Sequence, residues 1–246
     1  GKIAFCFPGQ GSIEEGMCRD IAEAVPEAMS VFETGCEASG LDLKKLCFEG
    51  DLETLFETEI QQPALVTSSL AVLAALTSRG IRPDYVVGHS VGEYAALGAV
   101  QAMDTASAIA LEQLLAAAQA EGARRAVMLK VSGAFHSPLV ERAASRLRPA
   151  VERITFAEPR VPFVSTVTAR VEHAERIGSL LVEQLTTPVR FTQSVGELVR
   201  EGVKTFVEVG PGTVLSGLVK RIDRSVTSLS VNNLAALQKL EDTLSA

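Results

Sequence analysis

The chain has 246 residues, of which 47% are hydrophobic and 22% charged, a balance typical of a soluble globular protein that excludes a disordered chain. Its 30 acidic and 23 basic side chains leave a net charge of -7, which argues against a nucleic-acid binder. The longest apolar run, Leu70 to Leu76, falls short of the roughly 18 residues of a membrane span, and no secretory signal pattern is visible. We therefore expect a cytoplasmic protein with no membrane or nucleic-acid partner.

Short apolar segments alternate with helical segments along almost the whole chain. In chain order the sequence predicts a strand over 3–7, a helix opened by Pro63 and stopped by Gly80, a strand over 85–87, a helix from about Val91, a nearly continuous Ala/Leu helix over 105–125, a strand over 127–131, a helix over 139–154, a strand over 161–164, a helix over 193–200, a strand over 205–209, a helix over 214–222 and a strand over 226–229. Strands separated by helices are joined by right-handed crossovers. We expect the α/β class: a mostly parallel sheet with helices on both faces and an α/β-hydrolase-like core.

The four cysteines, Cys6, Cys18, Cys36 and Cys47, lie in the first fifth of the chain without a CxxC pair or a nearby histidine. This spacing gives a zinc site little support. We expect free thiols, no metal and no cofactor.

The strongest local motif is Gly88-His89-Ser90-Val91-Gly92, which follows a predicted strand and precedes a predicted helix. That context is typical of a G-x-S-x-G nucleophile elbow, although a structural glycine turn is the alternative. Ser90 would lie at the carboxyl end of the sheet, and the backbone N–H of Val91 would donate to an oxyanion.

A serine nucleophile needs a base, and the chain has three histidines. His89 is expected to have a structural role beside the nucleophile, and His173 lies in a polar stretch that is typical of a surface. His136 precedes Ser137-Pro138, a helix start at the carboxyl end of a strand, so we predict that it is the base. The acidic residues between Ser90 and His136 do not lie where a hydrolase acid belongs, and a dyad oriented by a backbone carbonyl is sufficient.

Two glycine-rich loops follow predicted strands. The segment Phe7-Pro8-Gly9-Gln10-Gly11-Ser12 lacks the lysine of a phosphate-binding loop, and it fits a close backbone approach with an N–H aimed at an acyl oxygen. The segment Val209-Gly210-Pro211-Gly212 is either a tight turn that supports the sheet or a ligand contact.

Together these segments resemble the malonyl-CoA:acyl carrier protein transacylases and the acyltransferase domains of polyketide synthases. The matching segments, in chain order, are 7–12, 62–65, 88–94, 133–137, 184–189 and 208–212. The resemblance implies that Ser90 is the acylated nucleophile and His136 its base. It also implies that the Gln184 carbonyl holds the imidazole and that the N–H groups of Gln10 and Val91 form the oxyanion hole.

The resemblance further implies a reaction and its partners. Val91 and Phe135 look like the malonyl-preferring version of their motifs and would set substrate selectivity. A malonyl group would pass from malonyl-CoA through Ser90 to the phosphopantetheine thiol of an acyl carrier protein, in fatty acid or polyketide synthesis. Lys220, Arg221 and Arg224 are a candidate docking patch for that acidic carrier, with a solvated helix C-terminus as the alternative interpretation. We expect a monomer. The alternatives are a serine acyl hydrolase or thioesterase, and a weakly active core that only docks a carrier.

The sequence departs from the family at one place. The family has an Arg-Gly pair, whose arginine binds the malonyl carboxylate, followed by a small ferredoxin-like subdomain. Here 108–111 runs straight into 112–115, so no carboxylate-binding arginine is found, and Arg124 and Arg125 match a later segment. We expect 1–246 to form one acyltransferase core with a junction near 111–112. Either the sequence joins two pieces around a missing segment, which we favour, or the subdomain is deleted.

Overall fold

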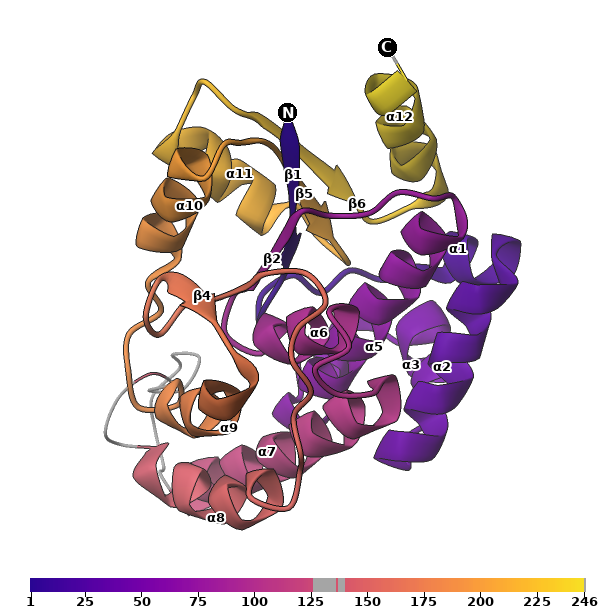
Figure 1. The fold of residues 1–246 in the computed structure, drawn as a ribbon. Coiled ribbons are helices and arrows are strands. Elements are labelled where there is room, and N and C mark those ends of the chain that lie inside the picture. The colour runs from indigo at the N-terminus through magenta and orange to yellow at the C-terminus, as the bar shows by residue number, and fades with distance from the viewer. Residues whose placement is uncertain (126–135, 137–139, 246) are drawn as a thin grey trace.

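A twisted sheet lies at the centre of the molecule, as the ribbon in Figure 1 shows. The computed structural model describes residues 1–125, 136 and 140–245, and for 121–125 only the backbone helix. Within these residues the sheet has six strands in the order β4-β3-β2-β1-β5-β6. The strands are β1 Lys2–Phe7, β2 Tyr85–Gly88, β3 Phe163–Ser165, β4 Arg170–Glu172, β5 Val203–Val209 and β6 Thr227–Val231. All neighbours pair in parallel except β4, which pairs antiparallel with β3.

Helices connect the strands and cover the sheet. They are α1 Arg19–Ala24, α2 Pro26–Ser39, α3 Leu43–Glu49, α4 Leu52–Leu55, α5 Thr58–Ser78, α6 Gly92–Ala99, α7 Thr105–Arg125, α8 Glu141–Val151, α9 Ala174–Glu183, α10 Phe191–Arg200, α11 Val214–Ile222 and α12 Leu234–Ser245. The predicted α/β class, with a mostly parallel sheet, is confirmed.

The two faces of the sheet bury different helices because successive strand residues point to opposite sides. Ala4 and Cys6 of β1 pack in one apolar cluster with α10 and α11. Phe5 and Phe7 pack in a larger cluster on the other face, with α5, α6 and the helices outside them. Figure 1 shows α10 and α11 on one side of the strands and α2, α5 and α6 on the other. The prediction of helices on both faces is therefore confirmed.

The helix that Pro63 was expected to open begins earlier, at Thr58, so that prediction is wrong. Glu57 has an extended backbone, and its carbonyl oxygen accepts the N–H groups of Ile60 and Gln61. These bonds form the first turn before the proline. Pro63 therefore lies inside α5, in its second turn, where it has no N–H to donate to the helical ladder.

Helix α5 is the one helix among the described residues that is long and apolar enough to cross a membrane by length and composition. This differs from the expectation that no stretch of the chain approaches that length. Of its most apolar window, 78% is buried inside the molecule. Such burial is typical of a core helix, and α5 packs between α2, α6 and α7.

Helix α7 passes through the predicted junction near 111–112 as one continuous helix, and its bounds agree with the predicted 105–125. Leu111 and Glu112, on either side of the junction, are both buried. The helix packs against α5, α2 and α8. The predicted strand over 127–131 lies outside the described residues.

The four cysteines are free thiols, as predicted. Cys6, Cys18 and Cys47 are buried, and burial raises the pKa of each, that of Cys47 to about 12. These buried thiols are therefore protonated and unreactive near neutral pH.

Candidate active site

Ser90 lies in a tight turn between β2 and α6, at the carboxyl end of the strand. Its backbone has φ 56°, a left-handed conformation that is strained for a residue with a side chain. The flanking glycines are required by close backbone contacts: a Cβ on Gly88 would lie 2.3 Å from the Glu93 nitrogen, and one on Gly92 would lie 2.1 Å from the Phe7 oxygen. The Gly-x-Ser-x-Gly pattern therefore produces the turn that presents the Ser90 hydroxyl.

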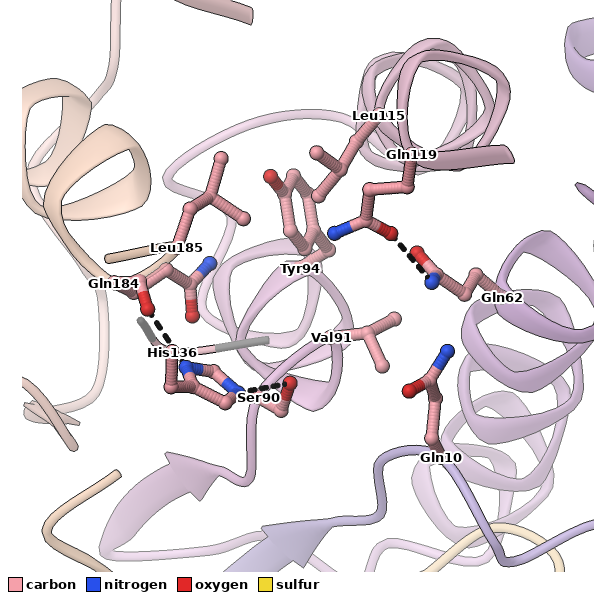
Figure 2. A pocket seen from close by; sticks show the side chains of 10 residues that line it. All are labelled: Gln10, Gln62, Ser90, Val91, Tyr94, Leu115, Gln119, His136, Gln184 and Leu185. Atoms are coloured by element: carbon pink, nitrogen blue, oxygen red, sulfur yellow. Dashed lines mark hydrogen bonds between the residues drawn. The ribbon is translucent and has the colours of Figure 1, made fainter. Parts of the chain in front are cut away.

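The structure brings His136 to this hydroxyl, as the dashed lines in Figure 2 show. The Ser90 Oγ lies 2.9 Å from His136 Nε2, and His136 Nδ1 lies 2.7 Å from the Gln184 carbonyl oxygen. A carbonyl can only accept, so Nδ1 carries the proton and Nε2 is left free to accept from the serine. This arrangement can abstract a proton from Ser90 without an acidic third residue.

Gln184 follows α9 and is 4% exposed. With its amide nitrogen facing the neighbouring acceptors, the side chain donates to the Ser90 carbonyl oxygen at 3.2 Å and to Glu93 Oε2 at 3.3 Å. The side chain of Gln184 thus contacts the turn that holds Ser90, and its backbone carbonyl contacts His136.

Gln10 and Val91 approach the same cavity from the loop after β1 and from the start of α6. Among the described residues, neither backbone N–H donates to a partner. Two free N–H groups beside a serine hydroxyl are suited to a developing oxyanion. The loop around Gln10 is held by Gln61, whose Oε1 accepts the Gly11 N–H at 3.2 Å.

The cavity above Ser90 is small, about 20 Å³, room for little more than one water molecule. It is lined by Gln10, Gln62, Ser90, Val91, Tyr94, Leu115, Gln119, His136, Gln184 and Leu185. Figure 2 shows Leu115 and Gln119 reaching over the site from α7. The Gln119 Oε1 accepts a hydrogen bond from Gln62 Nε2 at 2.7 Å. No lysine or arginine is among these lining residues.

A buried carboxyl group lies behind this cavity. Glu112 is fully buried, and neither of its oxygens has a hydrogen-bond partner in the described part of the chain. Burial raises the pKa of Glu112 well above its ordinary value, and Glu112 contributes to the raised pKa of Tyr94, a cavity residue. Burial therefore favours the protonated, uncharged form of Glu112.

The remaining predicted residues lie as follows. His89 is largely buried against Phe191, with ring centroids 5.5 Å apart, and burial lowers its pKa. His173 is on the surface, where it bonds to Glu158. Phe135 lies outside the described residues. Lys220, Arg221 and Arg224 are exposed. In residues 1–125, 136 and 140–245, no group of three His, Cys, Asp or Glu side chains could hold a metal ion.

Sequence reasoning missed the cavity residues of α7 and the burial of Glu93 behind the site. Leu115 and Gln119 are one helical turn apart and so share a face, a signal that marks a buried side but not what it covers. Glu93 follows the elbow directly, and only its partners in the fold set it apart from a surface residue.

A serine on a strained elbow, bonded to a histidine whose second nitrogen is fixed, defines a serine enzyme of the acyl-transferring α/β class. The family model described as the acyl transferase domain matches residues 4–112 and 105–244. The malonyl CoA-acyl carrier protein transacylase of Bacillus subtilis is 36% identical over 99% of this chain and 97% of that protein. Its alignment spans 309 positions, more than this chain contains, so the relative has residues without a counterpart here.

Solved structures with similar folds point to the same family. The structure of MCAT from Streptococcus pneumoniae matches with a TM-score of 0.92 and 29% identity, over 98% of this chain and 100% of that one. A malonyl-transacylase solved in complex with its type II polyketide synthase acyl-carrier protein matches with the same TM-score and identity, over 99% and 100%. The chain belongs to the acyl transferase family, and within it to the malonyl CoA-acyl carrier protein transacylases.

Proposed function

We propose that this chain transfers a malonyl group from malonyl-CoA to the phosphopantetheine thiol of an acyl carrier protein, through an ester on Ser90. The observation that carries the proposal is the hydrogen-bonded series from Ser90 Oγ to His136 Nε2 and from His136 Nδ1 to the Gln184 carbonyl. The relatives named above support the choice of donor and acceptor.

In the first half-reaction, Ser90 Oγ attacks the thioester carbonyl carbon while its proton passes to His136 Nε2. The carbonyl oxygen becomes an oxyanion that accepts the N–H groups of Gln10 and Val91. The C–S bond then breaks, the proton on His136 passes to the CoA sulfur, and malonyl-Ser90 remains. The Gln184 carbonyl stabilises the transient imidazolium by accepting its Nδ1–H.

The second half-reaction reverses these steps with a different thiol. The carrier's phosphopantetheine thiol gives its proton to His136 and its sulfur attacks the ester carbonyl. The C–O bond to Ser90 breaks, and His136 returns the proton to the serine oxygen. Because a thioester is already an activated acyl group, positioning and oxyanion binding supply most of the rate.

The docking surface is proposed on α11 and the residues after it. Lys220, Arg221 and Arg224 are all exposed there, and Lys220 also lines a surface groove of about 390 Å³ between α11, β6 and α12. An acidic carrier would be steered to these charges although the whole chain is negative. We propose that the enzyme acts as a monomer in the cytoplasm and that 1–246 is one core, joined near 111–112.

The test is the intact mass of the protein before and after brief incubation with malonyl-CoA. We expect a malonyl-sized gain in the wild type, its loss on addition of a holo carrier protein, and no gain in Ser90→Ala. Release of free malonate in place of transfer would support the hydrolase alternative. Absence of any gain in the wild type would contradict the proposed function.

A further inference from the structure

Glu93 is buried directly behind the reacting pair, in the first turn of α6, and the mechanism above does not use it. Its side chain is 1% exposed, and no positively charged group is paired with it among the described residues. A buried carboxyl group without a cation is costly unless hydrogen bonds satisfy it.

Neutral donors on two separate segments satisfy this carboxyl group. Its Oε1 accepts from the Thr166 N–H at 2.7 Å, the Thr166 hydroxyl at 2.9 Å and the Ser165 hydroxyl at 3.4 Å, all at the end of β3. Its Oε2 accepts from the side-chain amide of Gln184 at 3.3 Å. Burial raises the pKa of Glu93 to about 7, while the bonds from Thr166 and Ser165 lower it and so favour the carboxylate.

The Gln184 contact extends to the reacting atoms. The amide that donates to Glu93 also donates to the Ser90 carbonyl oxygen at 3.2 Å, and the backbone oxygen of Gln184 accepts from His136 Nδ1 at 2.7 Å. Glu93 is three residues after Ser90, so the contact joins the helix that begins at the nucleophile to the residue that holds its base. A shift of the Gln184 side chain would therefore disturb both the turn that holds Ser90 and the backbone carbonyl that holds His136.

We propose that Glu93 is a positioning residue of this site: by accepting the Gln184 amide it holds the Gln184 carbonyl where it fixes the His136 tautomer. This inference rests on the proposed roles of Ser90 and His136. Its consequence is that Glu93 acts on the rate of serine deprotonation and leaves the binding of the thioester unchanged.

The variant Glu93→Gln keeps the size of the side chain but has one oxygen in place of two, so either Thr166 or Gln184 loses its acceptor. We expect acylation of Ser90 by malonyl-CoA to slow about 10- to 100-fold, part of the roughly 10²- to 10⁴-fold that a general base supplies, with KM unchanged. Labelling of Ser90 by a fluorophosphonate, which needs no malonyl group, should slow in parallel. The ¹⁵N signals of the His136 ring should shift towards a mixture of tautomers.

Glu208→Gln is the matched control, since Glu208 is a buried carboxyl that accepts two backbone N–H groups at the start of α11. It should lower the midpoint of thermal unfolding without changing the labelling rate. If Glu93→Gln does not fold, Gln184→Ala replaces it, because that variant keeps the backbone carbonyl but lacks the amide.

Wild-type labelling rates and an unchanged His136 spectrum in the folded variant would overturn the inference. A different outcome would separate the two proposals. If the wild type transfers no malonyl group but Glu93→Gln is still labelled by the fluorophosphonate more slowly than the wild type, the inference is supported and the proposed function fails.

Discussion

Two buried carboxyl groups near the site differ in what surrounds them. Glu93 accepts bonds from Thr166, Ser165 and Gln184, whereas both oxygens of Glu112 have no partner in the described part of the chain. Satisfied polar groups specify a core, and unsatisfied ones cost stability. Glu112 is therefore the residue whose removal should help the fold.

We predict that Glu112→Gln raises the free energy of unfolding, by about 1–3 kcal/mol near neutral pH. In the folded wild type, burial raises the pKa of Glu112 and so favours its protonated form. In the unfolded chain the Glu112 carboxyl group has its ordinary pKa and ionises at any higher pH. The wild type therefore loses stability as pH rises above that ordinary pKa, and the gain of the variant grows as pH rises above about 4.5.

Urea unfolding at several pH values measures this gain. Glu33→Gln, a change at an exposed residue of α2, should show little effect at any pH. A gain for Glu112→Gln that is constant with pH, or a loss, would contradict the prediction.

At the scale of elements, α7 is a packed helix on both sides of the proposed junction near 111–112. Leu111, the residue before the junction, is 4% exposed, while Leu114, just after it, is 43% exposed. We predict that Leu111→Ala lowers the free energy of unfolding by about 2–4 kcal/mol, through lost burial and the cavity it leaves. Leu114→Ala should change it by less than about 0.5 kcal/mol.

Denaturant unfolding of both variants makes the comparison. Equal effects would mean that the helix is not packed through the junction in the way the structure shows.

The sequence predicted the elements with a clear hydrophobic signal and missed others. Strands β1 and β2 are mainly apolar runs, β5 has its apolar residues at Val203, Phe206, Val207 and Val209, and α7 is rich in Ala and Leu, so their positions could be predicted. Strand β4, three partly exposed residues antiparallel to β3, has no such signal.

The site followed the same rule. The elbow around Ser90 has a sequence pattern because glycines are needed for its close contacts. The Gln184 carbonyl is a backbone atom that any residue would have, and only the family resemblance pointed to it. The links from Glu93 to Gln184 and from Gln62 to Gln119 join segments far apart in the chain, so no local pattern predicts them.

At the scale of the whole molecule, no lysine or arginine is among the described residues that line the cavity, whose volume is about 20 Å³. A bidentate arginine–carboxylate pair is the usual means of selecting a dicarboxylic acyl group. If the subdomain is deleted from this protein, we predict that Ser90 is acylated weakly and with little selectivity, with malonyl-CoA and acetyl-CoA reacting at rates within about tenfold of each other. In that deleted form the acyl-enzyme should also be lost to water faster than in a relative that has the subdomain.

Rapid-quench mass spectrometry with each thioester gives the ratio of acylation rates, and the decay of the acyl-enzyme without carrier gives its lifetime. The transacylase of Bacillus subtilis, which has residues without a counterpart in this chain, is the reference enzyme for both measurements. A malonyl preference of about a hundredfold or more would contradict the prediction and point to a cation outside the cavity lining.

Because α7 is one continuous helix, the number of residues in it fixes which side chains face the core and which face the cavity. Each residue of an α-helix turns the next by about 100°, so adding or removing one residue at the junction would rotate everything after it by that angle. Leu115 and Gln119 would then leave the roof of the cavity, and Ala108 and Leu111 would no longer share a stripe with Ala118. Only insertions or deletions close to a whole number of helical turns would keep both the core face and the cavity face of α7 in place.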